Sequence, residues 1–232
     1  MMDWETPEVE VIERCLGKAG EIQLQRRGSE YEIIYNGIFL MATYNGASEK
    51  AAIREAIKKI TVRDKDSLSV LMGGLGAGFS LREALDFKVV KRLVVSEIEP
   101  AVIRWNRGPL GQFNNWAIFD PRVELINGDF VELLKAEAAG AVRDYSKAYE
   151  IVMVDTDNGS SWLSLPANYY LYRTEGLKLI SHCLVPGGVA CFWCQERETA
   201  LEKHLAEIFS EVHYNTVTEK TGKEGAYFLA IK

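Results

Sequence analysis

Residues 69–85 read SVLMGGLGAGFSLREAL, in which an apolar strand runs directly into a glycine-rich turn and then into a helical pattern. Gly74, Gly76 and Gly78 allow the backbone to turn sharply and to approach a ligand closely. The helix that follows would point free backbone N–H groups at that ligand. A tight turn with no ligand would carry similar glycines, so the loop alone is a weak motif. In its setting between a strand and a helix, it favours a ligand-binding α/β fold.

Apolar runs alternate with helical stretches beyond this segment. The expected strands are 68–72, 92–97, 123–127, 150–154 and 188–193, with helices near 79–87, 100–106, 130–137 and 170–183. Such alternation indicates a parallel sheet covered on both faces, and right-handed crossovers make it doubly wound. A helix at 197–209 and two runs separated by residues 220–224 then predict an antiparallel hairpin that closes the sheet edge. We therefore expect a mostly parallel seven-stranded sheet with an antiparallel last strand.

The N-terminal part of the chain has a different pattern. Three short runs at 21–25, 31–35 and 38–44 are rich in β-branched and aromatic residues, and Asn36-Gly37 between two of them favours a hairpin turn. From Ser48, the expected N-cap, apolar residues recur at helical spacing. The sequence thus predicts a small β-hairpin domain at 1–46 and an α/β domain at 47–232.

Acidic residues stand at the ends of three predicted parallel strands. Glu97 ends the second strand, where a carboxylate can accept both hydroxyls of a ribose. Asp129 follows the third strand and Asp155 follows the fourth. Each alone could be a helix cap or a solvated strand-end carboxylate. Ligands bind outside the carboxyl ends of the strands in such sheets, so these acids and the glycine loop should share one crevice.

Two adenosine-containing cofactors, NAD and S-adenosylmethionine (AdoMet), fit this pattern. Phe79 stands where a G-x-G-x-x-G fingerprint would need its third glycine, and no Tyr-x-x-x-Lys constellation for hydride transfer is present. Asp129, directly after Gly128, better matches the adenine amino contact of AdoMet proteins. An NAD-dependent oxidoreductase is therefore the weakest of the alternatives.

Composition narrows the class of protein further. The net charge of −6 argues mildly against a nucleic-acid surface, which needs a basic stripe. No run reaches the roughly 18 apolar residues of a membrane span. The acidic, polar start MMDWETPEVE is unlike a signal peptide, so a cytosolic location is the default expectation.

The cysteines suggest no metal or redox chemistry. Cys191 and Cys194 form a C-x-x-C pair inside an apolar run, whereas reactive pairs lie at helix N-termini. No second Cys or His pair stands at zinc spacing. We expect core cysteines, no metal site, and structural roles for His182, His204 and His213.

Several motifs in order resemble those of the spermidine synthases. VLMGGLGAGFSLREAL resembles their glycine motif, including the Arg82-Glu83 pair. The later segments that resemble the family are SEIEPAVI (96–103), NGDFVELL (127–134), IVMVDTDNGSSW (151–162) and LYRTEGLKLISHCLVPGGV (171–189). The resemblance covers nearly the whole chain, N-terminal hairpins included. It implies a methyltransferase-like fold and, as a separate expectation, a homodimer.

The resemblance also implies roles for individual residues. Glu97 would hold the ribose, and Asp129 the adenine amino group. Asp155 would contact the cofactor and take up the proton of the attacking amine. Asn158 matches a position that is usually a second acid gripping the amine, and Asp157 is adjacent to it. The cofactor would lie on the loop residues Gly74, Gly76, Ala77 and Gly78.

Three departures from the family pattern bear on the reaction. Ala77 stands where aminopropyltransferases carry an aspartate, which is expected to pair with the amine of decarboxylated AdoMet and to repel the carboxylate of AdoMet. Two like charges about 4 Å apart cost roughly 1–4 kcal/mol, so alanine removes that discrimination. Residues 48–50, Ser-Glu-Lys, replace the family's Tyr-Gln-Glu or Tyr-His-Glu, and the second acid is Asn158.

These features lead to two main hypotheses from different classes. The favoured one is a transferase that moves an alkyl group, with methyl favoured, from AdoMet to a small acceptor, most simply an amine. Its alternative within the same class is a polyamine aminopropyltransferase that uses decarboxylated AdoMet. The other class is a non-catalytic nucleoside-binding module that kept the fold and lost its acceptor site.

Overall fold

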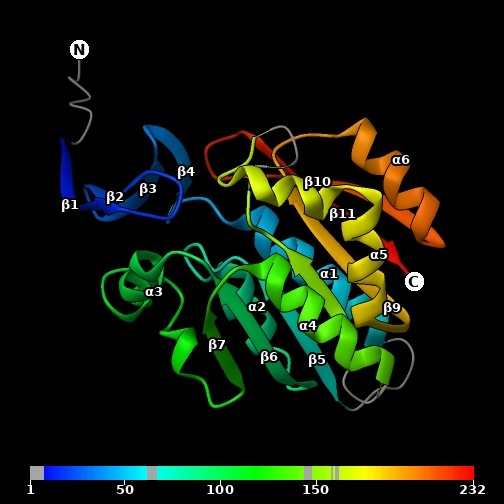
Figure 1. Cartoon of the computed structure of the whole chain (residues 1–232). Helices are drawn as coiled ribbons and strands as arrows, with labels where there is room; N and C mark the ends of the chain where they lie inside the picture. The colour runs from blue at the N-terminus through cyan, green and yellow to red at the C-terminus, as the bar shows by residue number, and fades with distance from the viewer. Residues whose placement is uncertain (1–7, 62–66, 144–147, 158, 160–161) are drawn as a thin grey trace.

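The computed structural model describes residues 8–61, 67–143, 148–157, 159 and 162–232. The chain forms a seven-stranded sheet with strand order β10-β11-β9-β8-β5-β6-β7 and a separate four-stranded sheet near the N-terminus (Figure 1). The strands of the large sheet are β5 (Leu68–Gly73), β6 (Val90–Glu97), β7 (Val123–Asn127), β8 (Tyr149–Val154), β9 (Leu184–Cys194), β10 (Glu211–Thr218) and β11 (Glu224–Ile231). Strands β5 to β9 pair in parallel, and β11 pairs antiparallel with both β9 and β10. The predicted sheet with its antiparallel last strand is confirmed.

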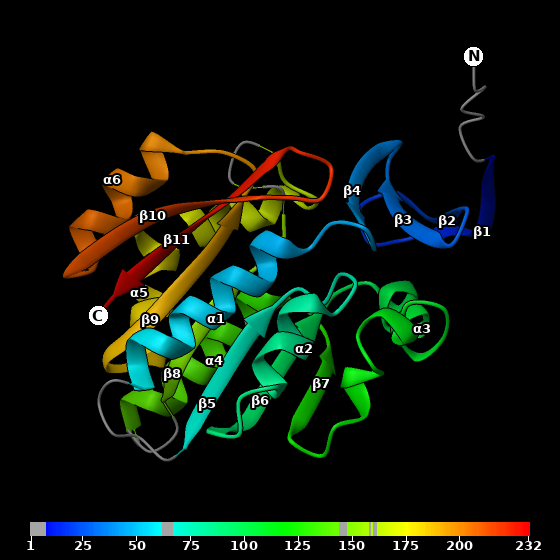
Figure 2. The ribbon, with the colours of Figure 1, turned by 180° about the vertical axis from the view of Figure 1, so that it is seen from behind.

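Helices cover both faces of the large sheet. They are α1 (Ala47–Thr61), α2 (Phe79–Leu85), α3 (Pro100–Arg107), α4 (Phe130–Arg143), α5 (Thr174–Cys183) and α6 (Thr199–Ile208), with 3-10 helices at Gly111–Phe113, Ala117–Phe119 and Pro166–Tyr172. Figure 1 shows α4 and α5 in front of the sheet, and the opposite view in Figure 2 shows α1 and α2. Because successive strand residues point to opposite faces, Val70 and Met72 pack with α1 and α2, whereas Leu71 packs with α4 and α5.

The small sheet contains β1 (Val9–Leu16), β2 (Glu21–Arg27), β3 (Glu30–Tyr35) and β4 (Ile38–Ala42), all antiparallel. The three predicted strands are present, and β1 is an additional one. It went unrecognised because charged residues interrupt its apolar ones, and it is an exposed edge strand. Ile22, Leu24, Ile33 and Tyr35 are buried on the face that joins the core of α1 and α2.

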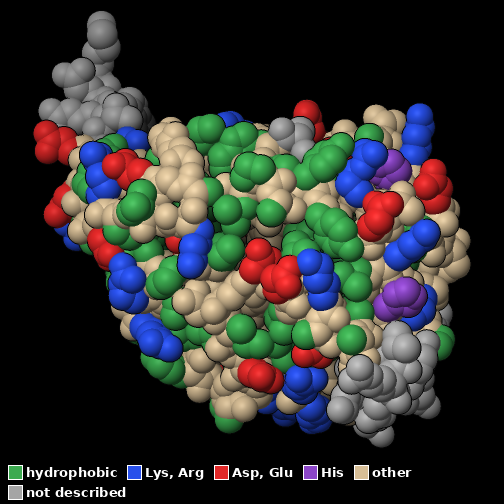
Figure 3. All heavy atoms as spheres, viewed as in Figure 1, with side chains coloured by type: hydrophobic (Ala, Val, Ile, Leu, Met, Phe, Trp, Pro, Cys, Tyr) green, Lys and Arg blue, Asp and Glu red, His purple; other side chains and the backbone are tan. Residues whose placement is uncertain are grey.

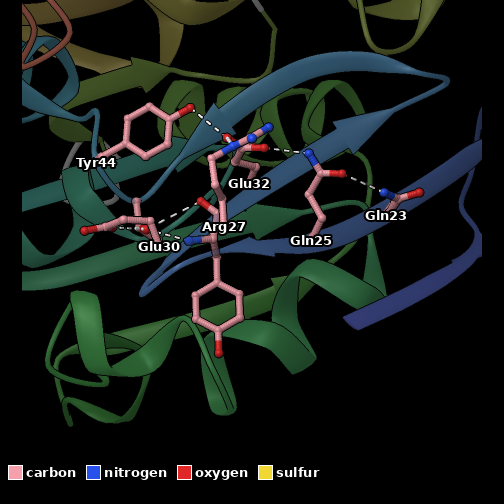
Figure 4. Close-up of polar contacts among 8 residues, drawn as sticks. Gln23, Gln25, Arg27, Glu30, Glu32 and Tyr44 are labelled. Carbon is pink, nitrogen blue, oxygen red and sulfur yellow. Dashed lines mark hydrogen bonds and ion pairs between the residues drawn. The ribbon is translucent and has the colours of Figure 1, made fainter. Parts of the chain in front are cut away.

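The other face of the small sheet carries a polar network centred on Glu32 (Figure 4). The carboxylate accepts hydrogen bonds from Gln25 Nε2 at 2.5 Å, Tyr44 OH at 2.9 Å and Arg27 Nε at 3.1 Å. Gln23 extends the network by donating to Gln25 Oε1 at 2.9 Å. Every oxygen of Glu32 therefore has a donor, which is what a buried carboxylate requires.

Two details differ from the sequence prediction. Ser48 is the second residue of α1 rather than its N-cap. The first amide groups of the helix are instead bound by Glu219, which follows β10. The helix expected from residue 170 begins at Thr174, because the preceding residues form the 3-10 helix. Cys191 and Cys194 are buried on β9 as expected.

Candidate active site

A cavity opens where the carboxyl ends of the central strands face the N-terminal sheet. The space between its walls, including the part that is open solvent, is about 1000 Å³. Its wall includes residues of the loop 74–77, of the ends of β6 and β8, and of the first turns of α1 and α2. The N-terminal sheet contributes Ile22, Ile33, Tyr35, Leu40 and Met41 to the wall. The crevice expected from the topology is therefore present, with a second sheet completing it.

The glycine loop is shaped by close backbone contacts. Gly74 and Gly78 have φ angles of 94° and 74°, in the region that disfavours side chains. A Cβ atom on Gly74 would lie 2.0 Å from the carbonyl oxygen of Asp155, where β5 and β8 end side by side. A Cβ atom on Gly78 would lie 2.6 Å from Nδ2 of Asn114. The turn thus needs these glycines for its own shape, and it brings the backbone of residues 74–77 to the cavity.

Glu97 ties the loop to the end of β6. Its side chain is buried, with Oε2 accepting the Leu75 N–H at 3.0 Å and Oε1 accepting the Glu99 N–H at 2.8 Å. Burial raises the pKa of Glu97 to about 7, although these two N–H groups act to lower it. A carboxylate offers roughly four acceptor positions, and the backbone N–H of Gly76 also acts on Glu97, so at least one position is left for a ligand hydroxyl.

Asp129 combines a structural contact with a place in the cavity wall. Its Oδ1 accepts the N–H of Val131 at 2.7 Å, which caps the start of α4. The residue also lines the cavity. Because the cap uses one oxygen, capping and ligand contact are compatible.

Asp155 follows β8 and lies opposite the start of α2, where Ser80 Oγ is 3.3 Å from its Oδ2. Burial raises the pKa of Asp155 to about 8. The neighbouring carboxylates of Glu49, Asp157 and Glu97 act in the same direction, whereas the Ser80 hydroxyl lowers the pKa. The surroundings of Asp155 within the protein therefore favour its protonated form more than water does.

Two more acids line the cavity. Glu49 reaches it from the first turn of α1. Glu99 is buried, and its Oε1 accepts hydrogen bonds from Tyr35 OH at 2.8 Å and from the Lys18 N–H at 2.6 Å. Its buried Oε2 has no hydrogen-bond partner among the described residues. The sequence placed neither acid at the site, although Glu99 stands only two residues beyond Glu97.

The cavity is strongly acidic. Its wall contains the carboxylates of Glu49, Glu97, Glu99, Asp129, Asp155 and Asp157, and no Lys, Arg or His among the described residues. The face of the molecule in Figure 3 differs from the cavity wall, because acidic and basic side chains are interspersed over it. A cation is the ligand that such a cavity would stabilise.

The family follows from the sequence as a whole. Residues 51–228 match the family model described as the spermine/spermidine synthase domain, which is well over half of the 232 residues. This chain belongs to the spermine/spermidine synthase family.

Two curated relatives of this spermine/spermidine synthase family member are named as polyamine aminopropyltransferases. Polyamine aminopropyltransferase of Mycobacterium tuberculosis is 28% identical over 169 residues, which cover 73% of this chain and 30% of that protein. Polyamine aminopropyltransferase 2 of Pseudomonas aeruginosa is 32% identical over 155 residues, which cover 62% of this chain and 40% of that protein. The chain thus matches less than half of the length of either relative.

Solved structures of spermidine synthases share the fold. The enzyme from Thermotoga maritima superimposes with a TM-score of 0.75 at 17% identity, covering 96% of this chain and 72% of that one. A spermidine synthase in complex with the transition-state analogue AdoDATO gives a TM-score of 0.74 at 16% identity, with the same coverage. At this identity the similarity concerns the fold alone.

Residues 77 and 158 are two of the positions at which the sequence departs from the family pattern. Ala77 is buried in the wall and offers no charge where the family resemblance implies an aspartate. Asn158, predicted to contact the amine, lies outside the described residues.

Among the described residues, no helix is both long enough and apolar enough to cross a membrane.

Asp157 lines the cavity, but donors already surround it. Its Oδ1 accepts hydrogen bonds from the Ser164 N–H at 2.7 Å and from Asn168 Nδ2 at 3.0 Å. Its Oδ2 accepts from Thr156 Oγ1 at 2.7 Å and from Tyr172 OH at 3.2 Å. These bonds favour a role in holding the loop after β8, and substrate binding by Asp157 stays a prediction.

Proposed function

We propose that this chain transfers an aminopropyl group from decarboxylated AdoMet to a small primary amine. The observation that carries the proposal is the cavity wall, with six carboxylates and no basic side chain among its described residues. Decarboxylated AdoMet carries a sulfonium and an ammonium group, and the acceptor brings a further amine. AdoMet carries an additional carboxylate, which such a wall would repel. The names of the curated relatives support the same reaction.

The donor would lie across the ends of β5, β6 and β7. Its adenine amino group would meet Asp129, and its ribose hydroxyls would meet Glu97 on the acceptor positions that the loop leaves free. The methionine-derived tail would run along the backbone of residues 74–78, including Ala77, toward Asp155. This placement puts the sulfonium next to the group whose pKa is raised to about 8.

The reaction is a displacement at carbon. The amine lone pair forms a C–N bond to the aminopropyl carbon attached to sulfur, and the C–S bond breaks with its electron pair going to sulfur. The sulfonium thereby becomes the neutral thioether of methylthioadenosine, and the new ammonium gives up a proton. The proton can instead leave the incoming protonated amine before the attack, in which case the new ammonium keeps its own protons. In either order, Asp155 would accept the one proton that leaves. A sulfonium bound there would lower the pKa of Asp155 and favour its ionised form while the donor is bound.

Methyl transfer from AdoMet is the second candidate, and Ala77 is the observation that favours it. Without an aspartate at this position, the loop itself no longer repels the donor carboxylate. The reaction would then release S-adenosylhomocysteine rather than methylthioadenosine.

The two products provide the test. Purified protein is incubated with each donor and a panel of diamines and polyamines, and the thioether product is identified by mass spectrometry. Aminopropyl transfer predicts methylthioadenosine only, together with tighter binding of decarboxylated AdoMet than of AdoMet by calorimetry. Release of S-adenosylhomocysteine would establish methyl transfer instead. Tight donor binding without turnover on any amine would favour the nucleoside-binding module.

A further inference from the structure

We propose that Glu49 determines donor specificity by binding the primary ammonium group of decarboxylated AdoMet, in place of the acid that Ala77 lacks. This inference rests on the proposed function and concerns the same cavity. It assigns a role in donor specificity to Glu49. The family resemblance identifies this residue only as part of a departure, since residues 48–50 do not match the family's Tyr-Gln-Glu or Tyr-His-Glu.

The packing of α1 against α2 places Glu49 near Ala77. A Cβ atom on Gly46, just before α1, would lie 2.3 Å from the ring of Phe79, two residues beyond Ala77. In the next turn, Lys50 Nζ lies 4.5 Å from the centroid of the same ring. In the sequence Glu49 stands between these two contact residues, and it lines the cavity together with Ala77. A carboxylate from α1 can thus reach the space that an aspartate at position 77 would serve.

A hydrogen-bond network fixes the start of α1. Glu219 accepts the N–H groups of Gly46, Ala47 and Ser48 at 2.8–3.0 Å. The Ser48 hydroxyl oxygen lies 2.6 Å from Glu219 Oε1 and 2.8 Å from Glu49 Oε2. Glu49 therefore extends from a turn whose backbone is held in one position, as a specificity contact requires.

The Ser48 hydroxyl cannot satisfy both carboxylates. It has a single hydrogen, and it already accepts a hydrogen bond from Trp193 Nε1 at 2.8 Å. Either Glu49 or Glu219 must lack that hydrogen, unless Glu49 itself carries a proton. A bound ammonium group would supply Glu49 with donors and a positive charge at once.

The charges around Glu49 favour a cationic ligand. Asp155 and Glu219 repel its negative charge, whereas Lys50, whose ammonium group lies over the Phe79 ring, attracts it. Burial raises the pKa of Glu49, and Glu219 acts in the same direction. Removing the carboxylate from a ligand that approaches Glu49 and Asp155 would relieve repulsion, so the pair would select the decarboxylated donor over AdoMet.

The test compares three ligands on wild-type protein and on Glu49→Gln by calorimetry. Losing a hydrogen bond between charged groups should weaken binding of decarboxylated AdoMet by about 10- to 100-fold. Methylthioadenosine lacks the ammonium group, so its affinity should stay within about twofold. AdoMet should bind the variant at least as tightly as it binds the wild-type protein. The preference for decarboxylated AdoMet over AdoMet should therefore be smaller in Glu49→Gln than in wild type, or absent.

Two further variants separate charge from structure. Ala77→Asp introduced into Glu49→Gln should restore at least tenfold of the lost affinity for decarboxylated AdoMet, because it returns a carboxylate to the donor tail. Glu55 lies on the same helix, and its exposed side chain pairs with Lys58. The control variant Glu55→Gln should leave the affinities for all three ligands unchanged.

The outcomes distinguish this inference from the proposed function. If wild-type protein neither binds decarboxylated AdoMet in preference to AdoMet nor forms methylthioadenosine, the proposed function fails. If wild type does both and Glu49→Gln keeps its donor preference, only the role of Glu49 is refuted. Equal losses for methylthioadenosine would likewise refute it, since they would mean a structural defect. A raised KM for the amine acceptor with unchanged donor affinity would assign Glu49 to the acceptor and overturn donor recognition.

Discussion

Two carboxylates in this molecule, the buried Glu32 and the half-buried Asp155, have opposite surroundings. Glu32, in the N-terminal sheet, is enclosed by Arg27, Gln25 and Tyr44, and all three donate hydrogen bonds to it. Burial would raise the pKa of Glu32, but these partners outweigh it and the net pKa is lowered. Asp155 in the cavity has one hydroxyl neighbour and several acids, and its pKa is raised to about 8.

We interpret the difference between Glu32 and Asp155 as the difference between a carboxylate that stabilises the fold and one that binds a ligand. A charge buried for stability is expected to have its partners in the folded chain, because an unpaired one costs several kcal/mol. Glu32 meets this condition within the sheet. Among the described residues, Asp155 has Glu49 and Glu97 near it and only the Ser80 hydroxyl as a hydrogen-bond donor, so a cationic ligand would supply the missing partner. The predictions below test this contrast, starting with the largest effect.

Replacing Asp155 with asparagine keeps the shape of the side chain but removes its ability to take a proton. We expect turnover to fall by about 10²- to 10⁴-fold, the usual range for a positioned acid–base group. The rate of methylthioadenosine formation at saturating donor measures it, and the affinity for methylthioadenosine serves as the control. Unchanged turnover would remove Asp155 from the mechanism.

Glu97→Ala removes the carboxylate proposed to bind the ribose. The loss should amount to roughly 1.5–3 kcal/mol, the contribution of hydrogen bonds to a charged group, or about a 10- to 100-fold rise in Kd. Calorimetry with methylthioadenosine measures it, because that ligand retains the ribose and lacks the charged tail. Thermal unfolding is the necessary control, since Glu97 also binds the loop through Leu75. An unaltered Kd would show that the ribose lies elsewhere.

Glu32→Gln should reduce stability and leave catalysis unaffected. We expect the free energy of unfolding to drop by about 1–3 kcal/mol, because buried donors lose a charged acceptor. Urea unfolding at neutral pH measures the drop. Glu10→Gln is the matched control, since its ion pair with Arg26 is exposed and should contribute about 0.2–1 kcal/mol. An equal loss in both variants would contradict the assigned role of the network.

The pH dependence of stability should have opposite signs for the two carboxylates. Asp155 holds its proton to about pH 8 in the folded protein but only to its ordinary pKa of 3.8 when unfolded. Stability therefore falls as pH rises across that range, and Asp155→Asn should raise the Tm of the ligand-free protein more at pH 9 than at pH 5. We expect a difference of at least about 2 °C, the shift for 1 kcal/mol in a chain of this size.

Glu32 gives the reverse trend. Its lowered pKa adds stability above its ordinary value of 4.5, and that stability is lost as pH falls through the folded pKa. Glu32→Gln should thus lower the Tm at pH 7 and converge with wild type in acid. Parallel curves for both variants would show that the two environments are electrostatically alike.

Much of the fold could be predicted from local patterns. Apolar runs of five or six residues between helical stretches located β5 to β9 within a few residues, because strand and helix periods differ. Gly74 and Gly78 marked the loop, since their positive φ angles exclude most other residues. β1 was missed, because an exposed edge strand such as Val9–Leu16 need not follow the apolar pattern of a buried one. The division at residue 46, a homodimer and a cytosolic location stay predictions.

The sequence by itself determined the order of elements and the acids at the strand ends, because parallel strands bring Glu97, Asp129 and Asp155 to one edge whatever else surrounds them. Only the tertiary structure decided how that edge becomes a cavity. Glu219 binds Gly46 across 173 residues, because β11 lies between β9 and β10 and α1 packs across these strands. Such a contact has no local periodicity or spacing to reveal it. The contact between Glu219 and the start of α1 sets the position of Glu49. Tertiary contacts also decide which acids have hydrogen-bond partners within the protein, as Glu32 does, and which we propose to bind a ligand, as Asp155 would.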